Sequence, residues 1–445
     1  MGETSEYSEN VPSNLEFLGG GFPVLTLQAV REDTDGDSPG LRTVKEVLRQ
    51  VLEFREADFV VQPLEEYTRV RGKRGGTWQE LMRFPAALHR EFTIEVSRLF
   101  CRTTIDSMDW RLPFDGLLLL GFPNDDWYDV FVNAVNGVHG FLFKFTFCTR
   151  EKSFDLDLDK LGFDAAGLRA LKQAVDAPKG MVLLSGPTHS GKSIVCYSSV
   201  MRRLRNGDSA VAVERPRKFR LPGARQIQLQ RGEDFCKGIP AALQDDPRVL
   251  LVQNLDCCED IVTSFAAARE RLVVAAIHAW EVIPCLRQLR NYGGWDRDRN
   301  ADHEKIRSFR ERLAENLSLV CSGRLLGMLC PHCRSEVDIP AATLERYGLH
   351  LGRQGMVRTY GKGSGCEKCR GSGFLKWTGV YEVLPVSPEM KRLIASPVPD
   401  CAFIRQARED GLVSLRDAAL KLALDGVISV KNALSSTPPP YYKSL

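Results

Sequence analysis

Apolar and polar residues follow one rhythm in the first third of the chain. The amphipathic stretch TVKEVLRQVLEF precedes the apolar run DFVVQP, and a second amphipathic stretch, ALHREFTIEVSRLF, comes later. Apolar residues at intervals of three and four predict helices, whereas short β-branched runs predict strands. We therefore expect a small N-terminal α/β domain over residues 41–150.

A different rhythm begins near residue 160. Short continuous apolar runs alternate there with polar or helix-patterned stretches, the runs being MVLLS, AVAVE, VLLVQ and LVVAAIH. Such runs are typical of parallel strands that crossover helices bury on both faces. The pattern predicts an α/β domain with a parallel sheet over residues 151–325.

The remaining segments differ in composition. Residues 326–386 are punctuated by cysteines, and residues 387–435 show helical patterns in PEMKRLIAS, CAFIRQARED and LRDAALKLALDGV. Residues 1–40 are rich in Gly, Ser, Asp and Glu around one apolar patch, and residues 436–445 are broken by prolines. We expect a cysteine-containing subdomain, a C-terminal helical region, a disordered tail over residues 1–40 and a proline-broken tail over residues 436–445.

Composition narrows the function classes. The 445 residues are 43% hydrophobic and carry 60 basic against 57 acidic side chains, a net charge of +3. With basic and acidic side chains so nearly balanced, the protein has no strong overall positive potential that would bind nucleic acid by charge alone. The first residues are polar and acidic, and no window approaches about 18 uninterrupted apolar residues. We expect a soluble, cytoplasmic protein without a transmembrane segment, whose thirteen cysteines are reduced.

A phosphate-binding motif follows the run MVLLS directly. The segment GPTHSGKS matches G-x-x-x-x-G-K-[ST] in full, and the helix-patterned IVCYSSVMRRLR follows it. Backbone N–H groups of such a loop cradle phosphates, while the lysine reaches the β- and γ-phosphates and the serine ligates Mg²⁺. The predicted ATP and Mg²⁺ site comprises Gly186, Pro187, Thr188, His189, Ser190, Gly191, Lys192 and Ser193.

Water activation needs a carboxylate at a neighbouring strand end. The run VLLVQNLD offers Asp256, while Asn254 at the strand's end is an amide that orients water but accepts no proton from it. Glu214 ends the run AVAVE and is a second catalytic candidate, although a solvated glutamate at a strand end fits the pattern equally well. His278 follows LVVAAI, either as a γ-phosphate contact or as a structural hydrogen-bonding residue.

Two C-x₂-C pairs predict a metal site. Cys330 and Cys333 form the first pair, and Cys366 and Cys369 form the second. Four thiolates at this spacing suit a closed, tetrahedral Zn²⁺ site that stabilises structure and catalyses nothing. Two unrelated reduced pairs are the alternative. His332 lies inside the first pair and is predicted to be a bystander, because four thiolates already complete the shell.

The ordered motifs resemble those of the type II secretion and type IV pilus assembly ATPases. The resemblance covers residues 43–435 and includes RLPFDG, VAVERPRKF, LQDDPRVLLVQNLD and RLVVAAIHAWE, followed by the tetracysteine and GVYEVLPV. It implies a RecA-like P-loop domain behind a flexibly joined N-terminal domain. It also implies a homo-hexamer or mixed ring at the inner membrane, in which ATP turnover acts on a membrane platform protein.

The resemblance implies further site residues and exposes departures from the family pattern. Arg111 matches an N-terminal arginine that helps to neutralise the phosphates. Gln253 and Asn254 stand where the family has Gly-Glu, so the carboxylate expected to act as base is missing. The other departures are Arg215 for Asp, Ala279 for Thr, Trp280 for Asn, His189 for Gly, and Leu117 and Phe131 for arginines.

Three functions remain open from sequence. The first is a motor that hydrolyses ATP slowly, with Glu214 or Asp256 activating water. The second is a hydrolysis-deficient paralogue that binds ATP as a scaffold or regulator, which the amide at Asn254 favours because losing a base costs about 10²–10⁴ in rate. The third, a nucleic-acid motor, lacks basic residues interleaved with aromatics outside RNYGGWDRDRN, so no nucleic-acid partner is expected.

Overall fold

The structure is a computed structural model of the 445-residue chain. It divides into two compact units, residues 1–154 with 218–220, and residues 155–217 with 221–445. The residues that it describes are 15–18, 22–26, 30, 34, 36–54, 58–74, 77–101, 114–121, 127–149, 156–188, 190–215, 217, 221–229, 233–291, 303–347, 352, 355–369 and 371–439.

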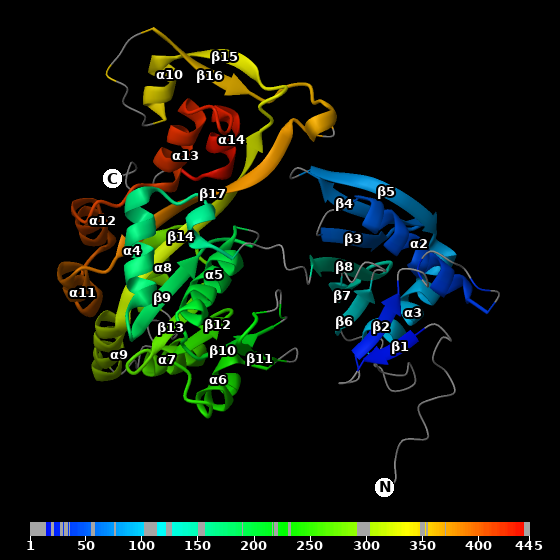
Figure 1. Ribbon diagram of the computed structural model, residues 1–445, viewed down its shortest axis with the longest axis horizontal. Helices are drawn as coiled ribbons and strands as arrows, with labels where there is room; N and C mark the ends of the chain where they lie inside the picture. The colour runs from blue at the N-terminus through cyan, green and yellow to red at the C-terminus, as the bar shows by residue number, and fades with distance from the viewer. Residues whose placement is uncertain are drawn as a thin grey trace. The chain divides into compact units, whose positions relative to one another are not determined.

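The first unit is an eight-stranded sheet with two helices, α2 (Pro39–Phe54) and α3 (His89–Cys101), packed on it (Figure 1). The strand order is β1-β2-β6-β7-β8-β3-β4-β5, and a short 3₁₀ turn, η1 (Ala86–Leu88), precedes α3. The strands are β1 (Leu15–Leu18), β2 (Phe22–Thr26), β3 (Asp58–Pro63), β4 (Tyr67–Arg74), β5 (Thr77–Pro85), β6 (Phe114–Gly121), β7 (Trp127–Gly137) and β8 (Gly140–Thr149).

Aromatic and β-branched residues form the core of this unit. Phe92 of α3 and Phe143 of β8 are fully buried, and their ring centroids lie 5.5 Å apart in an edge-on contact. Leu41, Val44 and Leu48 give α2 one apolar face, as the helical spacing predicts. β1 and β2 lie within residues 1–40, the segment expected to be a disordered tail, and they form one edge of the sheet through the parallel pairing of β2 with β6.

The second unit contains a seven-stranded sheet of order β11-β10-β12-β13-β9-β14-β17. Every residue of β9, β10, β12 and β13 is buried, which confirms the prediction drawn from the continuous apolar runs. The strands are β9 (Gly180–Ser185), β10 (Ala210–Glu214), β11 (Ala224–Gln228), β12 (Val249–Val252), β13 (Leu272–Ile277), β14 (Leu317–Leu329) and β17 (Phe374–Pro385). All neighbouring pairs are parallel except β14 with β17.

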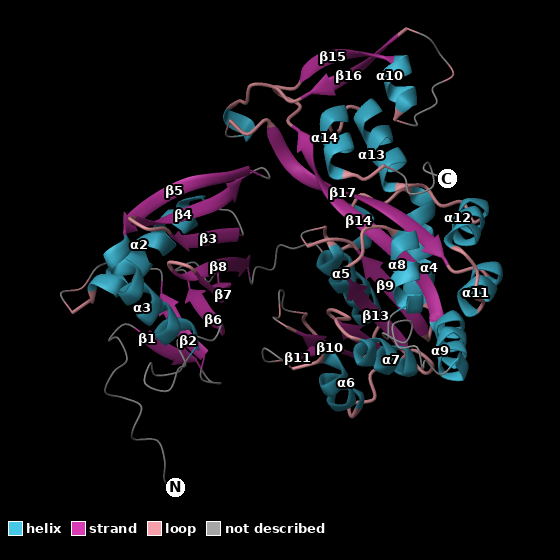
Figure 2. Ribbon diagram, turned by 180° about the vertical axis from the view of Figure 1, so that it is seen from behind, coloured by secondary structure: helices cyan, strands magenta, loops and turns pink. Residues whose placement is uncertain are grey.

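Helices cover both faces of this sheet (Figure 2). Alternate strand residues such as Leu183, Val213 and Val252 face one large core, which six helices complete, whereas α4 and α5 pack near the opposite face. Together with the turn η3 (Leu158–Lys160), the helices are α4 (Ala165–Asp176), α5 (Lys192–Arg205), α6 (Phe235–Leu243), α7 (Cys258–Ala267), α8 (Val282–Asn291), α9 (His303–Asn316), α11 (Pro388–Ala395) and α12 (Asp400–Glu409).

β14 and β17 continue beyond the rest of the sheet as a two-stranded ribbon, and a smaller core forms at its far end (Figures 1 and 2). Leu326 of β14, Leu344 and Leu420 are fully buried in that core. It is built from β15 (Ser335–Pro340), β16 (Met356–Gly361), α10 (Ala341–Arg346), α13 (Leu415–Leu424) and α14 (Val430–Ser436), with the turn η4 (Glu367–Cys369) nearby. The fold class is α/β, as the sequence predicts.

Candidate functional site

The P-loop connects β9 to α5. β9 ends at Ser185 and α5 begins at Lys192, so the loop lies at the N-terminus of a helix, where backbone N–H groups are free of intrahelical partners. Gly186 and Gly191 have φ values of 148° and 91°, which only glycine adopts without strain. A Cβ atom on Gly186 would lie 2.3 Å from the Ser190 Oγ, so close packing also demands glycine there.

Lys192 curls back over the loop that precedes it. Its ammonium donates hydrogen bonds to the backbone carbonyls of Gly186 and Pro187, at 2.6 and 2.8 Å. The Nζ atom is therefore held by the loop itself. His189 lies outside the described residues.

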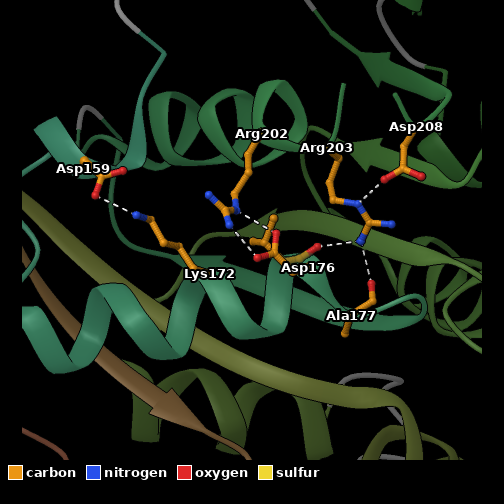
Figure 3. A network of polar contacts seen from close by, with 8 residues as sticks. Asp159, Lys172, Asp176, Ala177, Arg202, Arg203 and Asp208 are labelled. Carbon is orange, nitrogen blue, oxygen red and sulfur yellow. Dashed lines mark hydrogen bonds and ion pairs between the residues drawn. The ribbon is translucent and has the colours of Figure 1, made fainter. Parts of the chain in front are cut away.

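Ion pairs brace the helix that carries the P-loop (Figure 3). Arg202 of α5 forms a two-pronged contact with Asp176 at the end of α4, with distances of 2.7 and 2.6 Å. Arg203 donates to Asp208 at 2.5 Å and to the Ala177 carbonyl at 2.6 Å. Bidentate arginine contacts fix geometry better than single ion pairs, so the C-terminal half of α5 is tied firmly to α4.

Strand register places the other predicted residues at the same sheet edge as the P-loop. β13 pairs with β9 so that Ile277 lies opposite Ser185, and Val252 of β12 lies opposite Ala275 of β13. Parallel strands end at a common edge, which is where α/β sheets bind ligands. His278, Asn254 and Glu214 follow or end β13, β12 and β10 respectively, and so lie along this edge.

Glu214 is an interior residue. Its side chain has no solvent exposure, and its two carboxylate oxygens accept hydrogen bonds from the Tyr197 hydroxyl and from Gln226 Nε2, the latter at 2.7 Å. These partners come from α5 and β11. The alternative of a solvated strand-end glutamate is wrong, because the carboxylate is buried and is oriented from two sides inside the protein.

The residues that depart from the family pattern at the ends of β10 and β12 are linked by hydrogen bonds and by a shared contact with Asp256. The Arg215 backbone N–H donates to Gln253 Oε1 at 2.6 Å, and the Arg215 guanidinium pairs with Asp256 at 2.8 Å. The Asn254 side-chain amide also donates to Asp256. The carboxylate predicted as a substitute base is thus engaged by two neighbours.

Asp260 is a buried acid that sequence reasoning missed. Its carboxylate accepts hydrogen bonds from the backbone N–H groups of Cys236, Asp256 and Cys257, at 2.7, 3.1 and 3.3 Å. It stands in the first turn of α7, where an acidic residue completes a capping box. The sequence signal was an acid three residues after the N-cap residue Cys257, and its role is to hold the loop after β12.

The segment after His278 is anchored to β14. His278 is exposed at the end of β13, and the Trp280 carbonyl accepts hydrogen bonds from Ser322 Oγ at 3.2 Å and Arg324 Nη2 at 2.7 Å. The Arg324 guanidinium also lies 5.6 Å from the centre of the exposed Trp280 ring. The position of the histidine therefore depends on the neighbouring strand.

A buried charged cluster, formed by Glu281, Arg324, Glu382 and Arg416, lies behind this segment. Glu382 of β17 accepts hydrogen bonds from the backbone N–H groups of Val282, at 3.0 Å, and of the first residue of α13, at 3.3 Å. Burial, with Glu382 nearby, raises the pKa of Glu281 to about 8, and burial raises the pKa of Glu382 to about 7. Sequence reasoning missed these acids, because only tertiary packing brings them together.

The four cysteines meet at the far end of the ribbon. Their Sγ atoms all lie within 4.8 Å of one another, with Cys330 to Cys366 at 3.7 Å and both Cys333 and Cys366 at 3.8 Å from Cys369. A tetrahedron with Zn–S bonds of about 2.3 Å has edges of about 3.8 Å, so this donor set fits Zn²⁺. Hydrogen bonds from the N–H groups of Cys366 and Gly373 lower the pKa of Cys369 to about 6, which favours the ligating thiolate. His332 is exposed and lies outside the cluster.

The arginine that the resemblance implies in the first unit falls on a segment that the structure does not describe. Arg111 lies outside the described residues, as does the first part of the RLPFDG segment.

Within the part of the chain that the structure describes, we find no helix with the length and hydrophobicity needed to cross a bilayer.

Comparisons with known proteins agree with this arrangement. The pattern of the type II/IV secretion system protein family matches residues 33–435. The type IV pilus assembly ATPase PilB of Myxococcus xanthus is 27% identical, over 97% of this chain and 75% of the relative, and PilB of Pseudomonas aeruginosa is 26% identical over 89% and 67%. Type II secretion system protein E of Klebsiella pneumoniae is 26% identical over 92% and 78%.

Two solved structures share the fold at low identity. The Legionella pneumophila ATPase DotB aligns with a TM-score of 0.59 and 15% identity, over 90% of this chain and 96% of that one. The pilus retraction motor PilT with bound ADP aligns with a TM-score of 0.55 and 16% identity, over 90% and 98%. Since the family pattern covers most of the chain, this protein belongs to the type II/IV secretion system protein family.

Proposed function

We propose that this chain is an ATP-binding motor-type subunit of a type II secretion or type IV pilus assembly system. ATP binding and hydrolysis would drive domain motions that assemble a pilus or pseudopilus at the cytoplasmic side of the inner membrane. The observation that carries this proposal is the P-loop of residues 186–193, which shares one sheet edge with Glu214, Asn254 and His278. The relatives that span most of the chain are named for these systems.

The proposed binding chemistry uses the loop's backbone and two side chains. N–H groups at the start of α5 would hold the phosphates, with the helix dipole favouring negative charge. The Lys192 ammonium, now on the carbonyls of Gly186 and Pro187, would turn to the β- and γ-phosphates. Ser193 would ligate Mg²⁺, and Arg111 would add positive charge. Mg²⁺ supplies charge neutralisation between the terminal phosphates.

A specific contact favours a second candidate, an ATP-bound scaffold or regulator that does not hydrolyse ATP. Asn254 cannot act as a base, and Asp256 is paired with the Arg215 guanidinium at 2.8 Å. Glu214 is fully buried with both oxygens hydrogen-bonded. Each carboxylate near the strand ends is thus engaged within the protein, and activation of water would require one of them to be released.

The assembly follows from the same proposal. We propose a homo-hexamer or mixed ring that acts on an inner-membrane platform protein, as the resemblance implies. The tetracysteine cluster would hold a structural Zn²⁺ at the end of the ribbon. A closed site of four thiolates leaves no position for substrate, so its contribution is to stability.

Steady-state phosphate release with Mg²⁺-ATP tests the proposed function. The wild-type protein and Lys192→Ala are compared, and nucleotide binding by each is measured by calorimetry. We expect the wild type to bind Mg²⁺-ATP and to release phosphate slowly but above the Lys192→Ala background. Binding without any turnover would leave the scaffold as the function, and absence of binding would contradict both candidates.

A further inference from the structure

Side chains of β14 and β17 hold the backbone that follows His278. This backbone, residues 279–281, connects β13 to α8. The Trp280 carbonyl accepts its two hydrogen bonds from side chains of β14. The first N–H group of α8, on Val282, donates to Glu382 Oε2 of β17 at 3.0 Å. The segment between the histidine and α8 is therefore fixed at two points by the neighbouring strands.

Strand register connects this anchor to the strand that carries the P-loop. Ser322 of β14 lies opposite Glu382 of β17 on one side and opposite Ser185 of β9 on the other. Residues directly opposite one another on paired strands share a face of the sheet. All three are buried, and Ser185 is the last residue of β9 before the P-loop. Glu382 thus lies two strands from the start of the P-loop, in the same row of the sheet.

The carboxylate of Glu382 also holds a second helix. Its other oxygen, Oε1, accepts a hydrogen bond at 3.3 Å from the N–H group of Leu415, the first residue of α13. The first N–H groups of a helix have no intrahelical partner and carry partial positive charge, so a carboxylate suits them. Glu382 is only 3% exposed, which leaves little room for water to replace either bond. One buried side chain therefore caps two helices that are far apart in the sequence.

Both bonds depend on the two acceptor oxygens of a carboxylate. Burial raises the pKa of Glu382 to about 7, and the two N–H donors and the nearby Arg324 guanidinium oppose that rise. A glutamine would offer one acceptor oxygen and an amino group that only donates, so it could serve one of the two N–H groups and would oppose the other. The chemistry of this position therefore favours joining the two helices over capping either one alone.

We propose that Glu382 is a positioning residue for His278, and that it transmits displacements of α13 to the segment that follows this histidine. α8 packs in the large core of the second unit, whereas α13 packs in the smaller core at the far end of the ribbon. A shift of α13 would draw the carboxylate away from the Val282 N–H group and loosen the start of α8. The role of His278 at the nucleotide rests on the proposed function, but the connection between the two helices does not.

Hydrogen exchange of the full chain without nucleotide tests the connection. Wild type is compared with Leu415→Pro and Leu415→Ala at pH 8, above the pKa of Glu382. Proline lacks the N–H group but fits the first position of a helix, and Ser414 before it has the extended backbone that proline requires, with φ −68° and ψ 154°. Alanine also removes the leucine side chain but keeps the N–H group. The pair therefore isolates the bond to Glu382 from the loss of packing.

We expect Leu415→Pro to speed exchange of the amides of residues 282–288 about tenfold, because the buried carboxylate loses one of its two partners. Leu415→Ala should leave these amides at the wild-type rate. Glu382→Gln should speed exchange at the starts of both helices. Residues 258–267 of α7 serve as the internal reference, and thermal unfolding checks that each variant is folded. Equal exchange of residues 282–288 in the two Leu415 variants would overturn the inference.

A second measurement with Mg²⁺-ATP separates this inference from the proposed function. Calorimetry first measures binding by the wild type and by Glu382→Gln. We expect bound Mg²⁺-ATP to slow exchange of residues 412–420 about fivefold in the wild type and to leave it unchanged in Glu382→Gln. A response that is the same in both proteins, or absent from both, would contradict transmission through Glu382. If the wild type binds no nucleotide, the proposed function fails, and the comparison of the Leu415 variants decides the connection by itself.

Discussion

The phosphate-binding side and the acidic side of the sheet edge are held by different kinds of contact. The P-loop side relies on backbone, on the positive φ values of Gly186 and Gly191 and on carbonyls that hold Lys192. The acidic side relies on side chains, in which Arg215 and Asn254 both contact Asp256. Backbone sites need only glycines and one lysine, whereas water activation depends on the chemistry of a single side chain. Hydrolysis can therefore be weakened while the binding loop and the fold stay intact.

A carboxylate introduced at position 254 is the most direct test of whether hydrolysis is weak because the base is missing. We expect Asn254→Glu to raise the rate of phosphate release by about 10²-fold, since a positioned general base contributes about 10²–10⁴. Asn254→Gln is the matched control, because it has the same length without a carboxylate and should leave the rate unchanged. Steady-state phosphate assays with calorimetric binding measure both. Equal rates in the two variants would show that the missing base does not limit turnover.

The binding side was largely predictable from sequence, and the acidic side was not. Continuous apolar runs indicated β9, β10, β12 and β13 because strands buried on both faces leave no polar positions. The tetracysteine cluster followed from spacing, since two short pairs can close on one ion. Patterns of this kind can be read from a few neighbouring residues, which is why the sequence alone predicted them.

Contacts between distant segments escaped prediction. The residue Arg215 and its partner Asp256 are far apart in sequence, and only the pairing of β10 with β12 brings them together. Glu281 and Glu382 meet through packing of α8 on β17, and although Glu382 lies in an apolar run, nothing near either residue indicates the other as its neighbour. Glu214 was placed correctly at a strand end, but the Tyr197 and Gln226 contacts that bury it come from other elements.

Metal removal tests whether the ribbon that borders the P-loop depends on zinc. We expect Cys330→Ser to lose bound zinc and to lower the thermal unfolding midpoint by about 10 °C, because binding energy at a structural zinc site is folding energy. Cys401→Ser is the control, since Cys401 is an exposed thiol outside the cluster. Elemental analysis and calorimetry give both quantities. Unchanged stability after complete zinc loss would contradict a structural role.

The buried charged cluster predicts a pH dependence of stability. Because the folded-state pKa of Glu281 is about 8, above its ordinary value near 4.5, the folded protein binds this proton more tightly than the unfolded chain. Its contribution is complete below pH 4.5 and is lost as pH rises through about 8. Glu382, Arg324 and Arg416 face the same carboxyl group. We expect Glu281→Gln to flatten the fall in unfolding midpoint between pH 6 and pH 8.5, and an undiminished slope would contradict the assignment.

The smallest expected effect comes from releasing Asp256. The side chains of Arg215 and Asp256 are 27% and 41% exposed, so their ion pair contributes less than about 1 kcal/mol to stability. Arg215→Ser should leave the unfolding midpoint nearly unchanged. It should raise the rate of phosphate release about threefold, which is a small part of the rate increase that a well-placed general base supplies. Adding Asp256→Asn should remove that gain, because the freed carboxylate is then gone. If Arg215→Ser gains activity that survives the second change, Asp256 is not the residue that Arg215 restrains, and Glu214 becomes the carboxylate to test.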